Sequence, residues 1–202
     1  NGTVASQFVH PVVFGYDPEL KPEPYDPERA RRLLAEAGFS AGFDVELGHG
    51  NVDSGIIEAI VADLARVGVR VRPRAAPFSE IVALAREGRL PLVFYAWACS
   101  TGDASDFLNT SIHSRNTAGD LGVENYSGFA DPGTDALLEA ADREMDPARR
   151  RSLLQLAQRR ALGALPVLPL AIRWGYEGVS SRVDVVTRHD DRVWLAAYRW
   201  RS

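Results

Sequence analysis

The side chains best suited to chemistry gather in one short stretch, at the end of a strongly apolar run. The stretch reads YAWACSTGDASDFL, from Tyr95 to Leu108, and combines aromatic rings, hydroxyl groups and carboxylates. Trp97 offers a flat face to a ligand, and Asp103 offers a negative charge. In open α/β sheets ligands lie beyond the carboxyl ends of strands, so this position predicts a ligand site.

The same residues also have a structural interpretation. Trp97 then belongs to the hydrophobic core, and Asp103 caps the helix that follows. The sequence pattern does not separate the two interpretations. The candidate ligand-binding residues are Tyr95, Trp97, Ser100, Thr101, Asp103, Arg173 and Trp174.

An enzyme site would need an acid and a base. The candidates are Asp103 with Asp106, or His113 near them. The two aspartates are three residues apart, as on one face of a helix's first turn, where carboxylates stabilise the helix dipole without doing chemistry. Because no nucleophile motif or oxyanion signature accompanies them, we expect a protein that is not an enzyme.

Metal and thiol chemistry have no better support. His10, His49, His113 and His189 are scattered, and none has a ligand-type partner at a recognised spacing. Cys99 is the only cysteine, which excludes an intrachain disulfide and a cysteine-based zinc site. We interpret its thiol as a small buried hydrophobe and expect neither metal nor cofactor.

Composition narrows the class of protein further. The 202 residues are 46% hydrophobic and 25% charged, which is typical of a globular protein with one or two compact units. A net charge of -4 argues against a nucleic-acid partner, because neutralising phosphates needs a clustered basic excess. The longest apolar stretches, such as residues 90–99, are too short to cross a bilayer.

The elements before the candidate site alternate between helix and strand. Asp26 can cap a helix that has Pro27 at its first position and ends at Gly38. The next expected elements are a strand at 44–47, a helix at 56–67, a strand at 69–72, a helix at 79–87 and a strand at 90–98. The last of these is apolar throughout, as a strand covered on both faces would be, so we place it at the sheet centre.

The rest of the chain extends this pattern. Two helices begin with Asp–Pro pairs, at Asp131 and Asp146, and are expected to form a hairpin. Residues 183–186 and 193–198 are the last strand candidates. The fold class is therefore α/β, with a mixed sheet flanked by helices. Residues 1–25 contain four prolines and no sustained period, which predicts an extended connection.

A strand-like run follows the expected hairpin. Pro166 and Pro169 confine this strand, which runs to Ile172, to a sheet edge or to a crossing between two units. From there Arg173 and Trp174 could reach a cleft. Equally, Trp174 could pack beneath the hairpin.

Four stretches together resemble the second lobe of family 5 extracellular solute-binding proteins, the dipeptide and oligopeptide type of receptor. The most specific is YDPERARRLLAEAGF, at 25–39. The others are AIVADLARVGVRVRPRAAPFSEIVALAREGRLPLVFYAWA at 59–98, NYSGFADPGTDALLEAADREMDPARRRSLLQLAQRRAL at 125–162 and LPVLPLAI at 165–172. They stand in the family's order and cover nearly the whole chain.

The resemblance implies a periplasmic-binding-protein-like lobe of type II. Residues 1–25 would connect two lobes and 26–202 would form the second one, while the first lobe would come from sequence before Asn1. Such lobes are hinged and close on a ligand between them. The implied partners are a peptide or other small-molecule ligand and the membrane permease of an ABC importer. The implied location is periplasmic or extracellular, with a lipid anchor at the absent N-terminus as a further expectation.

The resemblance also bears on the ligand. In that family a Trp and, three residues on, an acidic residue commonly line the cleft, and the acid meets a peptide ammonium. Trp97 matches the first, Ser100 stands at the second, and Asp103 matches a further acidic position. A buried cation without an ion partner is costly, so the ligand either presents no ammonium here or has it met by Asp103. Peptides, peptide-like molecules, sugars and metal chelates are all open.

Two other hypotheses stand beside the receptor. One is a soluble α/β enzyme domain that uses Asp103 and Asp106. The other is a stand-alone interaction module. The module is disfavoured because residues 1–24 have the character of a segment that crosses between units.

Overall fold

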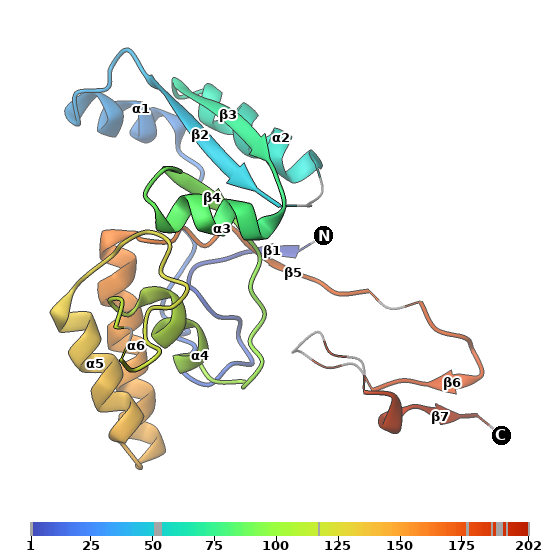
Figure 1. The fold of residues 1–202 in the computed structure, drawn as a ribbon. Coiled ribbons are helices and arrows are strands. Elements are labelled where there is room, and N and C mark those ends of the chain that lie inside the picture. Colours follow the sequence, from blue (N-terminus) through green and yellow to red (C-terminus); the bar gives the residue numbers. More distant parts are fainter. Residues whose placement is uncertain are drawn as a thin grey trace. The chain divides into compact units, whose positions relative to one another are not determined.

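The structure is a computed structural model, and it describes residues 2–50, 54–116, 118–176, 178–186, 188, 192 and 194–201 (Figure 1). The chain divides into two compact units. Unit 1 joins Asn1–Pro22 to Trp97–Ser202, and unit 2 is Glu23–Ala96. Unit 2 is therefore inserted, in sequence, into unit 1. Among the described residues, no helix is both long and apolar enough to cross a membrane.

Unit 2 is built on a parallel sheet. Its strands are β2 (Phe43–His49), β3 (Val69–Ala75) and β4 (Leu92–Phe94), in the order β3-β2-β4. Both pairings in this sheet are parallel, which requires a crossover between successive strands. The crossovers are the helices α2 (Ser54–Ala65) and α3 (Phe78–Arg86). This arrangement confirms the predicted α/β class.

The first helix of unit 2 follows its sequence signals closely. It is α1 (Pro27–Glu36), and the side chain of Asp26 accepts a hydrogen bond from the amide of Arg29 over 2.8 Å. This contact satisfies one of the amides that a helix start leaves without an intrahelical partner. Gly38 follows the helix with φ +87°, a backbone conformation that favours glycine. The predicted cap and stop are both confirmed.

The core of unit 2 lies between the sheet and α2. Leu47 and Val71 from the sheet are buried with Ile57 from α2. On β3 the buried Val69 and Val71 alternate with exposed arginines, the pattern of a strand with one covered face. A smaller cluster joins Ile81 and Leu90 beside α3.

The placement of residues 90–98 at the sheet centre is wrong. Only Leu92–Phe94 form a strand, and β2 lies between β3 and β4 in the described sheet. Leu92 is 39% exposed. The apolar run misled because Leu90 is buried without being part of a strand: it packs with Ile81 of α3 against Gly48 of β2.

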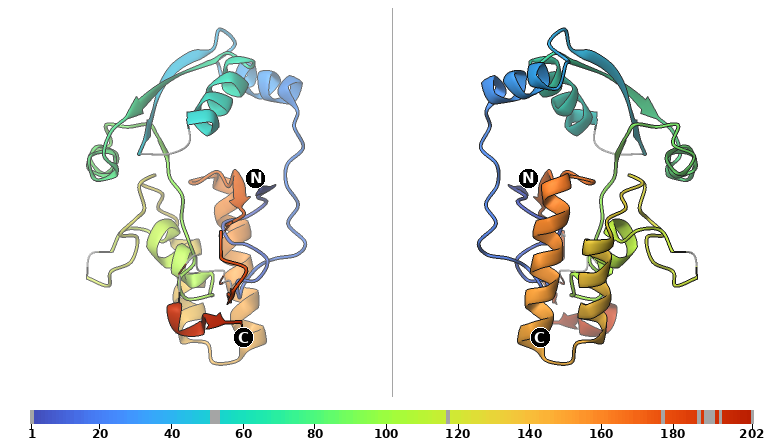
Figure 2. Two further views of the ribbon diagram at one scale, coloured as in Figure 1. Left: turned by 90° about the vertical axis from the view of Figure 1, so that its right-hand side faces the viewer. Right: turned by 90° about the vertical axis from the view of Figure 1, so that its left-hand side faces the viewer.

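Unit 1 contains the predicted helical hairpin. The helices α5 (Pro132–Arg143) and α6 (Pro147–Ala164) lie side by side (Figure 2). Asp131 and Asp146 cap them, each accepting from backbone amides two or three residues on. Leu138 and Leu154 are fully buried. Both predicted helix starts are therefore confirmed.

Short elements complete unit 1. A single-turn helix, α4 (Ser105–Phe107), runs into a π-helical turn, η1 (Leu108–Ile112). Strands β1 (Gly2–Val4) and β5 (Ala171–Arg173) pair antiparallel in a two-stranded sheet. Parallel and antiparallel pairing thus both occur, in separate sheets. The two-stranded pairing leaves β5 at an edge, as Pro166 and Pro169 predict.

The C-terminal strand predictions are partly correct. Residues 183–186 contain β6 (Val183–Asp184), which pairs antiparallel with β7 (Arg199–Trp200). Of the predicted strand at 193–198, Val193 lies outside the described residues, and Leu195–Ala197 form a 3₁₀ turn, η2, so the strand is wrong there. Leu195 is 74% exposed, and adjacent alanines have little preference for strands.

The N-terminal segment packs closely within unit 1. Gln7 and Asp17 are both buried, and they exchange hydrogen bonds of 2.7 and 2.9 Å between side chain and backbone. From α6, Gln158 donates to the carbonyl of Gly15 over 2.8 Å. Arg159 reaches the carboxylate of Asp17 over 2.6 Å. Residues 7–17 are thus fastened to α6.

Candidate functional site

The predicted site forms a tight turn in unit 1, closed by Asp106. One oxygen of this carboxylate, Oδ2, accepts hydrogen bonds from the amide and the hydroxyl of Ser100, both at 3.0 Å. The same oxygen accepts from the amide and the hydroxyl of Thr101, at 3.2 and 3.3 Å. The carboxylate of Asp106 therefore stabilises the conformation of residues 100 and 101.

Asp103 is held in an ion pair. Its carboxylate faces the guanidinium of Arg150 from α6, with 3.2 Å between Nη2 of Arg150 and Oδ1 of Asp103 and a closer contact to Oδ2. The amide of Ser105 donates to Oδ1 over 2.9 Å. Burial alone would raise the pKa of Asp103, but hydrogen bonds from Arg150 and Ser105 outweigh it and hold the pKa below its ordinary value. The carboxylate is thus ionised and already paired.

Trp97 lies at the margin of an aromatic cluster. It is half-buried, and its ring meets Phe107 edge-on, with centroids 5.0 Å apart and planes at 70°. Phe8 stacks on Phe107 with centroids 5.4 Å apart. Such contacts contribute about 0.5–1.5 kcal/mol beyond area burial. Trp97 therefore has a packed edge and an exposed part, which suits a ring that supports the fold and also meets a ligand.

The structure groups some of the candidate residues and separates others. Trp97, Ser100, Thr101 and Asp103 lie in one turn of unit 1. Tyr95, by contrast, belongs to unit 2 and is half-buried there.

The remaining two candidates follow the hairpin. Arg173 ends β5, opposite Gly2 of β1, and is exposed. Trp174 is 58% exposed, so most of its ring surface is uncovered in this chain.

The residues of the enzyme alternative are engaged in structural contacts. Asp103 is paired with Arg150, and Asp106 closes the turn. His113 is 3% exposed, and its Nδ1 lies 2.7 Å from the carbonyl of Ser114, to which it donates. Its Nε2 lies 3.8 Å from Glu139, with no described hydrogen-bond partner.

Two further predictions concern metal and thiol chemistry. No three His, Cys, Asp or Glu side chains gather around a metal-sized space in the described part of the chain, and His189 lies outside it. Cys99 is buried, as expected of a small hydrophobe, and its thiol donates to the carbonyl of Asp103 over 3.5 Å.

Sequence reasoning missed two residues that shape this turn. Asp106 was considered only as an acid or a helix-dipole partner, and Arg150 was not considered at all. The run of arginines at 149–151, one turn into a capped helix, was the available signal for Arg150. It did not identify the partner, because Asp103 is 47 residues away in sequence.

The sequence matches a known family over more than half its length. The sequence model described as bacterial extracellular solute-binding proteins, family 5 Middle, matches residues 1–119. Heme-binding protein A of Haemophilus influenzae is 31% identical over 90% of this chain and 34% of its own length. Di/tripeptide-binding protein 2 of Pseudomonas aeruginosa is 32% identical over 80% of this chain and 31% of its own length. The chain thus spans about a third of these relatives.

Solved structures agree with these matches. HbpA2 from Haemophilus parasuis covers 100% of this chain, with a TM-score of 0.84 and 27% identity, and the match spans 40% of that chain. The dipeptide-binding protein from Pseudoalteromonas sp. SM9913, in complex with Met-Leu, covers 100% of this chain and 41% of its own, with a TM-score of 0.80 and 25% identity. The predicted periplasmic-binding-protein-like fold is therefore confirmed.

Proposed function

This chain belongs to the bacterial extracellular solute-binding proteins of family 5, and on that premise we propose that it forms a ligand-binding lobe of a solute receptor. The receptor delivers peptides or related small solutes to an ABC transporter. The observation that carries the proposal is the family match over residues 1–119, which includes the turn at 97–107. Members of this family are binding proteins, and the receptor is accordingly not an enzyme.

The partners in this proposal follow from the family. Residues 26–202 belong to a second lobe, residues 1–25 connect it to a first lobe, and a membrane permease receives the ligand. The receptor works in the periplasm or outside the cell, held by a lipid anchor. Relatives that extend well beyond the region matched here support a first lobe.

The ligand's own chemistry follows from the turn. Asp103 has a guanidinium partner and Asp106 has four hydrogen-bond donors. An ammonium placed here would have to compete with Arg150 for Asp103, and the charge of Arg150 would repel it. The ligand therefore presents a neutral group to this turn. Neutral peptide-like molecules and peptides bound with the amine elsewhere both satisfy this condition.

Binding to the full-length receptor tests the proposal. Ligands are found by calorimetry with di- and tripeptides, their N-acetylated forms and heme, which the names of relatives suggest. Trp97→Ala should weaken binding of the best ligand at least tenfold, because the side chain is only partly buried and its exposed part can contact the ligand. Phe8→Leu is the matched control, since it removes the ring that stacks on Phe107 and so loosens the same aromatic cluster.

The two variants separate a ligand role from a packing role. Equal melting temperatures with affinity lost only in Trp97→Ala support the site. Affinity unchanged in Trp97→Ala, with a lower melting temperature, would assign the ring to the core and remove this turn from the cleft.

A further inference from the structure

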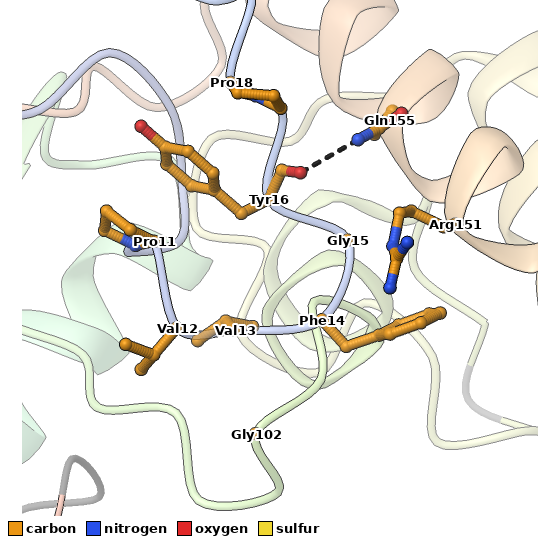
Figure 3. A pocket seen from close by; sticks show the side chains of 10 residues that line it. All are labelled: Pro11, Val12, Val13, Phe14, Gly15, Tyr16, Pro18, Gly102, Arg151 and Gln155. Atoms are coloured by element: carbon orange, nitrogen blue, oxygen red, sulfur yellow. Dashed lines mark hydrogen bonds between the residues drawn. The ribbon is translucent and has the colours of Figure 1, made fainter. Parts of the chain in front are cut away.

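An open hollow in unit 1 adjoins the turn discussed above, with which it shares Gly102. It is lined by the loop at residues 11–18, by Gly102 and by two side chains of α6, Arg151 and Gln155 (Figure 3). Its volume is about 520 Å³, within the range of small-molecule sites. All of its lining residues belong to unit 1, so its walls do not depend on how the two units are placed.

The loop that forms the wall is firmly held. Gln155 donates to the carbonyl of Tyr16 over 2.8 Å, a bond drawn in Figure 3. The amide of Phe14 donates to the carbonyl of Gly102 over 2.9 Å. Together with the contacts of Asp17 and Gly15 to α6, these bonds fix the shape of the hollow before any ligand arrives. A preformed wall reduces the entropy lost on binding.

Arg151 differs from the other arginines of α6. Four of the five pair with a carboxylate: Arg149 with Glu144, Arg150 with Asp103, Arg159 with Asp17 and Arg160 with Asp131. Within the described part of the chain, no carboxylate lies in ion-pair distance of Arg151.

The guanidinium of Arg151 is nevertheless positioned. It lies over the ring of Phe14, 4.8 Å from the centroid, with that of Arg150 5.4 Å from the same centroid. Around this ring two positive charges stand against the single carboxylate of Asp103. The hollow therefore carries a net positive charge on one wall.

Besides Arg151 and the polar side chain of Gln155, the lining offers apolar side chains. Val12 is 61% exposed, and Pro11 and Pro18 are also exposed. An apolar body placed here would cover these side chains and release the water on them. A fixed cation beside exposed apolar surface suits a ligand that combines a negative charge with an apolar body.

We propose that this hollow binds an organic anion, with its carboxylate paired to Arg151 and its apolar body on Pro11, Val12 and Pro18. A guanidinium binds a carboxylate through paired N–H donors, which gives direction as well as charge. The site shares only Gly102 with the turn at 97–107 and does not depend on the proposed receptor function. The carboxylate can belong to a small free acid or to an acidic side chain of a protein partner.

The test uses the full-length protein with N-acetylphenylalanine as the anion and N-acetylphenylalaninamide as its neutral counterpart. Methyl NMR of Val12 and Val13 locates binding, and the titration gives the affinity. We expect saturable shifts at these methyls with the acid and at least tenfold weaker binding of the amide. Arg151→Gln should weaken the acid at least tenfold, while Arg149→Gln, on the same helix but paired with Glu144, should leave it unchanged.

Further measurements identify the source of the carboxylate and show whether binding is independent of Trp97. The acidic peptide N-acetyl-Asp-Phe-amide is then compared with the free acid. If the peptide binds more tightly, the site is assigned to a protein partner. If the peptide binds more weakly, the site is assigned to a small acid. Trp97→Ala should not alter either titration. Equal binding of acid and amide, unchanged binding in Arg151→Gln, or shifts confined to other methyls would overturn the proposal.

Discussion

Ser100 and Asp106 are joined twice: the hydroxyl and the backbone amide of Ser100 both donate to Oδ2 of Asp106, each over 3.0 Å. The serine hydroxyl, which could otherwise reach a ligand, therefore serves first as a donor within its own turn. The carboxylate in turn has little capacity left on that oxygen, since Thr101 donates to it twice as well. The turn is therefore held by hydrogen bonds among its own residues.

Removing this carboxylate should loosen the turn. Asp106→Ala deletes the shared acceptor and should lower the free energy of unfolding by about 1–2 kcal/mol, since hydrogen bonds to charged groups are among the stronger ones. Urea denaturation measures the change. Glu19→Ala, an exposed acid in unit 1, is the control and should change stability by less than about 0.5 kcal/mol. A loss no larger than that of the control would show that the contacts contribute little.

An acidic side chain at position 100 should be tolerated without loss of stability only if the charge of Asp106 is removed. Ser100→Asp sets two carboxylates against each other and should cost about 1–2 kcal/mol. Adding Asp106→Asn removes the repulsion, so the double variant should be more stable than the sum of the single changes. In the full-length receptor, Met-Leu should gain affinity only in the double variant, by calorimetry. Additive stabilities would show that the two side chains do not interact.

The ion pair between Asp103 and Arg150 predicts a pH dependence. The pKa of Asp103 is lowered from 3.8, so its contribution to stability is present above the unfolded value and is lost as pH falls through the folded one. Asp103→Asn should cost about 2 kcal/mol at pH 7, since Arg150 loses its partner. Denaturation at several pH values should show the gap to wild type shrinking below about pH 4. A gap independent of pH would contradict the assignment.

Gly15 should resist substitution more than Gly128, although both glycines have positive φ. Its φ is +92°, and a Cβ there would meet the Cβ of Ala104 at 2.8 Å and Leu154 at 3.2 Å. Gly15→Ala should cost about 2–4 kcal/mol, from backbone strain and from overpacking. Gly128 has φ +70° and open space around its Cβ position, so Gly128→Ala measures the backbone part alone, at about 1 kcal/mol. Equal melting temperatures for the two variants would refute the clash.

Local signals predicted the fold well where they act over a few residues. Asp26 and Pro27 begin α1 as expected, and Val69 and Val71 are buried on β3 as their alternation indicates. The position of β4 could not be derived in this way. An apolar run indicates burial but not the neighbour that provides it, and Leu90 is buried beside α3.

The sequence predicted where the candidate site lies but not which side chains in it contact one another. Trp97, Ser100 and Asp103 lie together as their closeness in sequence requires. The pairing of Asp103 with Arg150 depends on α6 packing near the turn, which spacing along the chain does not encode. The hollow beside Arg151 was missed for the same reason, since its wall and its charge are more than a hundred residues apart.

The insertion of unit 2 into unit 1 determines the order in which the two units can fold during synthesis. A chain that emerges N-terminus first exposes Asp17 long before Arg159, which lies 142 residues later. At about 5–20 residues per second, the delay is on the order of ten seconds. Unit 2 has all its strands by then and can fold first, while the N-terminal segment must stay open and uncommitted. The segment's apolar side chains, such as Val9 and Val13, are buried in the folded unit 1 and lack that cover during the delay.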